Sequence, residues 1–328
     1  MTIDAYGRDA HLLLRRRPAG NQDEVQDESS GGFIQIPFFS ATLGVNQPNT
    51  SEAKLPSSRL PSKQIPDLAD ASGSIVTCLD SDAIGWHLCA LFGLPQTTGS
   101  ADPYTHVWTL APSDLFRHDV YLEDRGLAAP LYTRHEGLVW NTMQLNVAKS
   151  GAAQRVTFGV LGEGETVLGT SGDAAPLLPQ DPFEFRSWQG SVSVEGIADG
   201  GVTACDFTIN NGLEPDQGLL NAKATPAGYL LGDLSGAGTL TVRHRSDFYD
   251  AIARSNANFD LNVGYVQSPE RQITMRLHNC VVPRVPREIA GAGVIERRYG
   301  FALDEPDNAD TPVTVTLVNG RANWDMPA

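Results

Sequence analysis

The sequence repeats its own pattern of elements at a constant distance, and this limits the chain to folds built from two similar units. Gly73-Ser-Ile-Val-Thr returns 165 residues later as Gly238-Thr-Leu-Thr-Val, and Ser81-Asp82 returns as Ser246-Asp247 at the same distance. The stretches that precede these strands, 46–72 and 211–237, are equally long. Internal repeats of this kind indicate a duplicated unit. The alternative is chance similarity between generic β sequences.

Each repeat is predicted to hold one short helix. The segment SDAIGWHLCALFG reads as a helix capped by Ser81, with Asp82 in its first turn. Its predicted apolar face is formed by Ile84, Leu88, Leu91 and Phe92. In the second repeat Tyr249 and Ala253 fall opposite Ile84 and Leu88, whereas Phe248 and Ile252 are expected to supply the apolar face.

The rest of the chain favours strands. Glycine (32 residues) and proline (21) are plentiful while charged residues make up only 19%, which suits short strands joined by turns. After the first helix we predict strands by alternation of apolar and polar residues at 105–110, 119–123, 137–147 and 155–161. The fold class is therefore predicted to be mostly β, with no βαβ series.

Composition predicts five consecutive segments. Residues 1–32, with the basic run Arg15 to Arg17 before an acidic stretch, are expected to form an N-terminal arm outside the core. A first domain at 33–165, a Gly/Pro/Asp-rich connector at 166–185 and a second domain at 186–305 follow. Residues 306–328 are expected to form a C-terminal strand or tail that augments a sheet of its own chain or of a neighbour's.

Charge, hydropathy and cysteine usage exclude several classes of protein. The formal net charge of −15 argues against a sequence-nonspecific nucleic-acid binder, which needs clustered Lys and Arg. No run of 18 apolar residues and no signal peptide is found, so we expect a protein without a membrane association that is not secreted. The four cysteines lack metal-ligand spacing and are predicted to be buried free thiols.

No credible catalytic, cofactor or metal site emerges from the sequence. His106, His118 and His135 lie near Asp102, Asp114 and Asp119, but no HExxH or HxH spacing occurs and the group is not repeated in the second half. The glycines of GEGETVLGTSG precede no GK[ST], and no GxSxG motif joins a strand to a helix. Asp247 beside His244 is explained by a helix N-terminus. We therefore predict no enzyme activity and no cofactor.

Each half, read as strand, long loop, strand, short helix and several strands, resembles the tube domain of phage tail tube proteins from long non-contractile tails. The segments that carry the resemblance are GSIVTCLDSDAIGWHLCALFG, GLVWNTMQLNVAKSGAAQRVTFGVLGEG and QITMRLHNCVVPRVPREIAGAGVIERRYGFAL. It covers about residues 33–305 in two copies. It implies two tandem tail-tube-type β-sandwich or partial-barrel domains, each with a short flanking α-helix.

The resemblance also implies a function. It suggests a structural subunit that assembles with itself into stacked rings, with other tail proteins at the ends of the tube. The tube would be a channel for delivering genome DNA into the host, located in the virion tail after assembly in the host cytoplasm. DNA would pass through the lumen without specific binding, repelled by acidic residues of the wall.

Two domains per chain predict homotrimeric rings with pseudo-sixfold symmetry. Six domains with about four inner strands each give a barrel of about 24 strands, with a backbone radius of about 24 Å. A hexamer in which one domain lines the lumen is the alternative.

Two other function classes remain open at this stage. One is a carbohydrate- or receptor-binding β-sandwich, such as an adhesin or another virion decoration protein, and the other is a capsid or connector subunit. A sugar-binding protein would expose aromatic platforms, for which the chain offers five tryptophans, namely Trp86, Trp108, Trp140, Trp188 and Trp324. Trp86 and Trp140 lie in predicted elements and are expected to pack in the core or an interface.

Overall fold

The structure is a computed structural model that describes residues 7–52, 62–110, 115–180, 182–198, 201–220, 223–286, 292–304 and 311–326. Across these residues strands predominate, and two α-helices interrupt them. The predicted mostly-β fold class is therefore confirmed.

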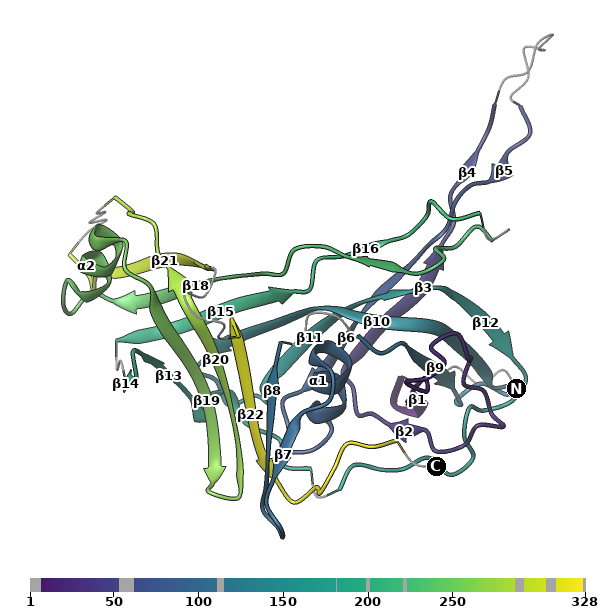
Figure 1. Ribbon diagram of the computed structural model, residues 1–328, viewed down its shortest axis with the longest axis horizontal. Helices are drawn as coiled ribbons and strands as arrows, with labels where there is room; N and C mark the ends of the chain where they lie inside the picture. The colour runs from purple at the N-terminus through teal and green to yellow at the C-terminus, as the bar shows by residue number, and fades with distance from the viewer. Residues whose placement is uncertain are drawn as a thin grey trace.

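A continuous antiparallel sheet of seven strands, called the main sheet below, crosses the molecule (Figure 1). Its core-facing side carries a cross-strand row of Ile75, Phe158, Met143 and Ile209, each 0% exposed. The strands, in spatial order, are β3 (Ser40–Asn46), β6 (Asp70–Cys78), β11 (Arg155–Gly162), β10 (Leu131–Ala148), β15 (Val202–Asn210), β18 (Ser235–Arg243) and β21 (Glu296–Leu303).

A second antiparallel sheet covers the core on the other side. Its buried row of Val263, Met275, Val315 and Trp108 belongs to the same hydrophobic cluster as the row of the main sheet. In spatial order it comprises β14 (Ile197–Ala198), β13 (Gly190–Val194), β19 (Phe259–Ser268), β20 (Arg271–Val281), β22 (Val313–Asn319), β8 (Tyr104–Thr109) and β7 (Gln96–Thr98).

The N-terminal segment forms part of the core, so the prediction of an arm outside it is wrong for residues 10–17. β1 (Ala10–Arg16) pairs along its whole length with β9 (His118–Asp124), which pairs with the first half of β10. β2 (Ile34–Gln35) and β12 (Gly164–Leu168) complete this third sheet. Three consecutive leucines at 12–14 are at most 1% exposed. A strand buried on both faces has no alternation, which is why pattern analysis missed it.

Both predicted helices are present, with differences at their ends and faces. α1 (Ile84–Phe92) is buried along all nine residues, so its four predicted apolar positions are only part of its contact surface. The prediction that Ser81 caps this helix is wrong. The N-cap residue is Ala83, which makes no side-chain capping bond. Asp80, three residues earlier, accepts hydrogen bonds at its Oδ1 from the backbone N–H groups of Asp82 (2.9 Å) and Ile84 (3.0 Å).

The second helix is α2 (Phe248–Ser255), and it begins directly after Asp247 as predicted. Its buried residues are Tyr249, Asp250 and Ala253, whereas Phe248 is 37% exposed. The expected apolar face is therefore wrong for Phe248, whereas Ile252 is partly buried and packs against the core. The buried face uses the two positions that fall opposite Ile84 and Leu88 in the repeat.

Each long loop of the repeat contains a small hairpin. β4 (Asn49–Thr50) pairs with β5 (Ile65–Pro66) in the first loop, and β16 (Leu213–Pro215) pairs with β17 (Tyr229–Leu231) in the second. The first hairpin projects away from the body, while the second runs along it (Figure 1). Short 3-10 helices, η1 (Gly7–Asp9) and η2 (Ser187–Gln189), complete the elements.

The C-terminal segment binds its own chain, which settles the choice left open by its sequence. β22 inserts between β20 of the second half and β8 of the first half. Beyond it Trp324 is 2% exposed and packs edge-on against Trp86 at a ring distance of 5.2 Å. The tail therefore links the two halves.

The two halves share one hydrophobic cluster, which contains Ile75 and Phe158 from the first half and Leu240 and Tyr299 from the second. Phe185, in the predicted connector, is also fully buried in this cluster. Apart from the N-terminal arm, the five-segment division remains a prediction, but the halves are packed as one body within the described residues. The four cysteines are buried free thiols, as predicted.

Candidate assembly surface

The two halves place equivalent strands in the same order in the main sheet. The first half contributes β3, β6, β11 and β10, and the second contributes β15, β18 and β21, with β20 touching β21 through Cys280 and Val281. β6 and β18 are both nine residues long and lie 165 residues apart. Because every neighbouring pair is antiparallel, β3 and β15 point the same way, as two copies of one unit related by a rotation would.

The main sheet is polar on the side that faces away from the core, called the open face below. One cross-strand row on this face consists of Ser40, Val76, Thr157, Gln144, Thr208, Ala237 and Ala302. The next row consists of Thr42, Ser74, Gly159, Thr142, Asn210 and Ser235. Hydroxyl and amide groups therefore dominate the centre of this face, and small side chains keep it flat.

Charges on the open face are few and balanced. Within the seven strands, its carboxylates are Asp70, Asp206 and Glu296, and its guanidinium groups are Arg155, Arg243 and Arg298. Arg243 and Glu296 form an ion pair with Nε and Oε1 3.6 Å apart. The face is thus formally neutral although the whole chain carries −15. The acidic surplus lies elsewhere on the molecule.

The main sheet ends in two strands that each lack a partner on one side. Within the described residues, β3 pairs only with β6, and residues 296–301 of β21 pair only with β18. Unpaired strand edges are sites where another chain can extend a sheet. These two edges are therefore candidates for contacts between copies.

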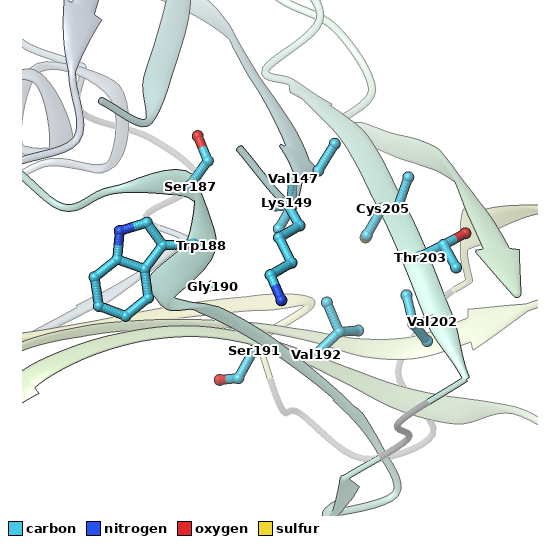
Figure 2. Close-up of a pocket in the computed structure, with 12 residues that line it drawn as sticks. Val147, Lys149, Ser187, Trp188, Gly190, Ser191, Val192, Val202, Thr203 and Cys205 are labelled. Carbon is cyan, nitrogen blue, oxygen red and sulfur yellow. The ribbon is translucent and has the colours of Figure 1, made fainter. Parts of the chain in front are cut away.

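A groove of about 380 Å³ opens where the two halves meet, between η2 and the adjoining ends of β10, β13 and β15. Figure 2 shows Lys149 extending across it, with Trp188 on one side and Val202 on the other. Trp188 is 58% exposed, whereas the other four tryptophans are at most 2% exposed. A single exposed ring gives little support to a sugar-binding platform.

The histidines singled out from the sequence occupy separate environments. His106 bonds to Thr97 Oγ1 (2.8 Å) and Asn319 Oδ1 (3.1 Å), and His118 packs edge-on against Trp140. Asp119 binds Arg17, Asp102 faces Arg271, and Asp114 lies outside the described residues. In the part of the chain that the structure covers, no three metal-ligating side chains come together. The hypothesis of a site at these residues receives no support.

Four buried histidines predict acid sensitivity. Burial lowers the pKa of His87 and of His118 to about 3 each, and that of His135 to about 4. In the unfolded chain these histidines become protonated as the pH falls through about 6.5, whereas in the folded chain they stay neutral to lower pH. The free energy of unfolding therefore decreases as the pH drops from about 6.5 towards about 4. Burial of Asp80 raises its pKa to about 7, which acts in the opposite direction over the same range. Burial also lowers the pKa of His106. Because four histidines oppose the single carboxyl group of Asp80, urea unfolding midpoints should decrease steadily below about pH 6.5. A midpoint that increases on acidification would contradict this assignment.

Comparison with known proteins identifies one family. A family model described as phage tail tube protein matches residues 7–316. A search of curated proteins found no match. Among the described residues, no helix is both long and apolar enough to cross a membrane. The match includes β1 and most of β22, so it extends at both ends beyond the 33–305 range predicted from sequence.

Proposed function

The chain belongs to the phage tail tube protein family, and from this premise we propose that three copies close into a ring with pseudo-sixfold symmetry. Membership makes the protein a structural component of the virion tail. The observation that carries the trimer is the repeated strand order β3–β6–β11–β10 and β15–β18–β21 within one continuous sheet. Each chain then supplies two of the six units in a ring.

The dimensions of such a ring fit a DNA channel. Three main sheets of seven strands, or eight if the segment after β20 joins them, give about 21 to 24 strands. With strands about 4.8 Å apart and tilted by about 40°, the backbone radius is about 21 to 24 Å. Even after inward-pointing side chains narrow this channel, it is wide enough for a DNA duplex about 20 Å across. Stacked rings would form the tube through which the genome reaches the host.

The open face of the main sheet is the surface we assign to the channel wall. Its opposite face is filled by the core, and its edges are the places where copies join. With this assignment the proposed wall differs from the acidic wall expected from the net charge, since the face carries as many guanidinium groups as carboxylates. A neutral wall of hydroxyl and amide groups gives neither electrostatic retention nor repulsion of phosphates. No step in this role requires catalysis or a cofactor.

Negative-stain electron microscopy of the purified protein at high concentration tests the assembly. We expect tubes with a central channel and end views with three-fold symmetry, because each chain supplies two units. Native mass measurement of isolated rings should give three copies of the 35.3 kDa chain. Rings of six chains would favour the hexamer, in which one half lines the lumen. A protein that stays monomeric at all concentrations would contradict the proposal.

A further inference from the structure

The two ends of the main sheet are built from different elements. β3 and β15 both run into a hairpin, so the two hairpins leave the same end of the sheet, called the hairpin end below. β6 and β18 run the opposite way and lead into α1 and α2, which mark the other end, called the helix end. Figure 1 shows α2 and the hairpin strand β16 at opposite sides of the molecule. In a ring of copies related by rotation, each end contributes to one face of the ring.

Exposed carboxylates accumulate at the hairpin end. Five of them form no ion pair within the described residues, namely Glu52, Asp67, Asp70, Glu214 and Asp233. They lie in the two hairpins or within two residues of the strands β6 and β18 that follow them. Lys63 and Lys223 are the amino groups that the described residues place at this end. Across the described residues, the hairpin end therefore carries an excess of negative charge.

Cations without a counter-ion accumulate at the helix end. Four exposed residues there carry a positive charge and have no carboxylate partner in the part of the chain that the structure describes, namely Lys149, Arg155, Arg245 and Arg298. Four carboxylates at this end are each paired with an arginine already, namely Glu184, Asp247, Asp250 and Glu296. Glu195, which lacks such a partner, accepts a hydrogen bond from the backbone N–H of Asp260 at 2.8 Å. The helix end therefore carries an excess of positive charge.

Both ends also expose apolar side chains beside their charges. The groove next to η2 opens at the helix end, where Lys149 and the exposed ring of Trp188 line it (Figure 2). At the hairpin end, Leu230 is paired with Glu214 in the second hairpin, and Leu230 and Leu231 are 55% and 53% exposed. An apolar surface next to charges of one sign is suited to contact with a surface of the same kind and the opposite sign.

We propose that rings stack head to tail through these two ends, with the carboxylates at the hairpin end of one copy facing the cations at the helix end of a copy in the next ring. This inference rests on the proposed ring, and it adds the chemistry of the contact between rings. Opposite charges attract over a Debye length of about 10 Å at about 0.1 M salt, so they act before side chains meet. Stacking of two like ends would oppose carboxylates to carboxylates or cations to cations. The charges therefore also give the tube one direction.

The salt dependence of tube formation tests the role of charge. Tubes and isolated rings are separated by sedimentation and counted by electron microscopy between about 0.1 and about 1 M NaCl, over which the Debye length falls from about 10 Å to about 3 Å. The protein concentration needed for tubes should rise about tenfold or more across this range, whereas rings, which close through strand edges, should persist. Tubes that form equally well at both salt concentrations would overturn this inference and leave the proposed ring intact.

Charge reversal at each end tests which groups take part. Asp233→Lys and Arg245→Glu change exposed side chains, and each should raise the concentration needed for tubes at about 0.1 M NaCl by about tenfold, since every contact between rings would contain three copies of the change. Glu270→Lys is the matched control, because it alters the charge as Asp233→Lys does but at the turn between β19 and β20, away from both ends (Figure 1). It should leave that concentration unchanged, and all three variants should keep the melting temperature of the single chain. Equal effects of Asp233→Lys and Glu270→Lys would contradict the assignment of the hairpin end.

Carbodiimide cross-linking measures the contact directly. The reagent joins a lysine amino group to a carboxylate that touches it through an amide bond, and the carbodiimide takes up the water that is lost. In tubes, mass spectrometry should find Lys149 joined to a carboxylate of the hairpin end, such as Glu214 or Asp233, and this product should be absent from isolated rings at about 1 M NaCl. Lys149→Arg keeps the charge, so it should form tubes that lack the product. Tubes in which Lys149 gives no such product would overturn this inference alone. A wild-type protein that forms no rings would contradict the proposed function, and this inference with it.

Discussion

Replacing Gly238 by alanine is expected to destabilise the protein by about 3 kcal/mol or more, because the new methyl group would overlap main-chain atoms of the neighbouring strand. A Cβ at Gly238 would meet the carbonyl oxygen of Asp206 and the ring of Phe301. At Gly73, the equivalent position of the first half, it would meet the carbonyl oxygen of Thr42. Main-chain atoms cannot move aside without breaking the ladders β15–β18 or β3–β6.

The measurement is urea unfolding of Gly73→Ala and Gly238→Ala, followed by tryptophan fluorescence. Gly300→Ala is the matched control, since this glycine of β21 lies in the same sheet and a Cβ there would meet nothing within 4 Å. Its unfolding free energy should stay within about 0.5 kcal/mol of wild type. If either repeat glycine tolerates alanine as well as Gly300 does, the close approach of the strands is not what fixes glycine at these two positions.

The repeat glycines also show what sequence can reveal. A strand that approaches its neighbour closely requires glycine at a fixed position, so Gly73 and Gly238 mark the same place in both halves. The predicted strands at 105–110, 119–123 and 155–161 agree with β8, β9 and β11 to within one residue at each end. Two of them, β8 and β11, alternate between buried and less buried residues, and this local pattern is sufficient to find them.

Features that depend on distant partners were not predictable in the same way. β1 pairs along its whole length with β9, which lies more than 100 residues later in the chain, and its three leucines lack the alternation of a surface strand. The position of β22 between β20 and β8 depends on pairings that no local pattern encodes. Ala83 rather than Ser81 is the N-cap residue of α1, and the hydroxyl of Ser81 instead accepts a hydrogen bond from the backbone N–H of the distant Phe183.

The charge of the open face illustrates a further limit. Net charge is a sum over the whole surface, and an acidic chain gave no information on which face holds the carboxylates. Only the strand registers identify Asp206 and Arg155 as members of one neutral face. The sequence repeat therefore indicated that the two halves contribute equivalent strands to one surface. Which side chains lie on that surface became known only from the pairing of the strands.

Replacing Asp119 by alanine is expected to cost about 3 to 5 kcal/mol of stability, because it removes the fully buried one of the two carboxylates that pair with the buried guanidinium group of Arg17. Asp119 is 0% exposed and binds Arg17 through two hydrogen bonds, of 2.8 and 3.0 Å. Burial alone would lower the pKa of Arg17, but its bonds to Asp119 and Glu163 raise it overall. Asp119 also accepts from the backbone N–H groups of Gln26 (2.6 Å) and Gly137 (3.0 Å).

This cluster attaches residues 17–26, which follow β1, to the rest of the fold, so the variant tests whether that segment contributes to stability. Urea unfolding should show the loss for Asp119→Ala, and limited proteolysis should cut near residues 17–26 faster than in wild type. Asp23→Ala is the control, because Asp23 is 89% exposed and its ion pair with Arg117 should contribute less than about 1 kcal/mol. The double variant Arg17→Met, Asp119→Ala should recover part of the loss by removing the uncompensated charge, but not the part due to the two backbone N–H groups. If the double variant is as unstable as Asp119→Ala, the backbone bonds rather than the ion pair anchor the segment.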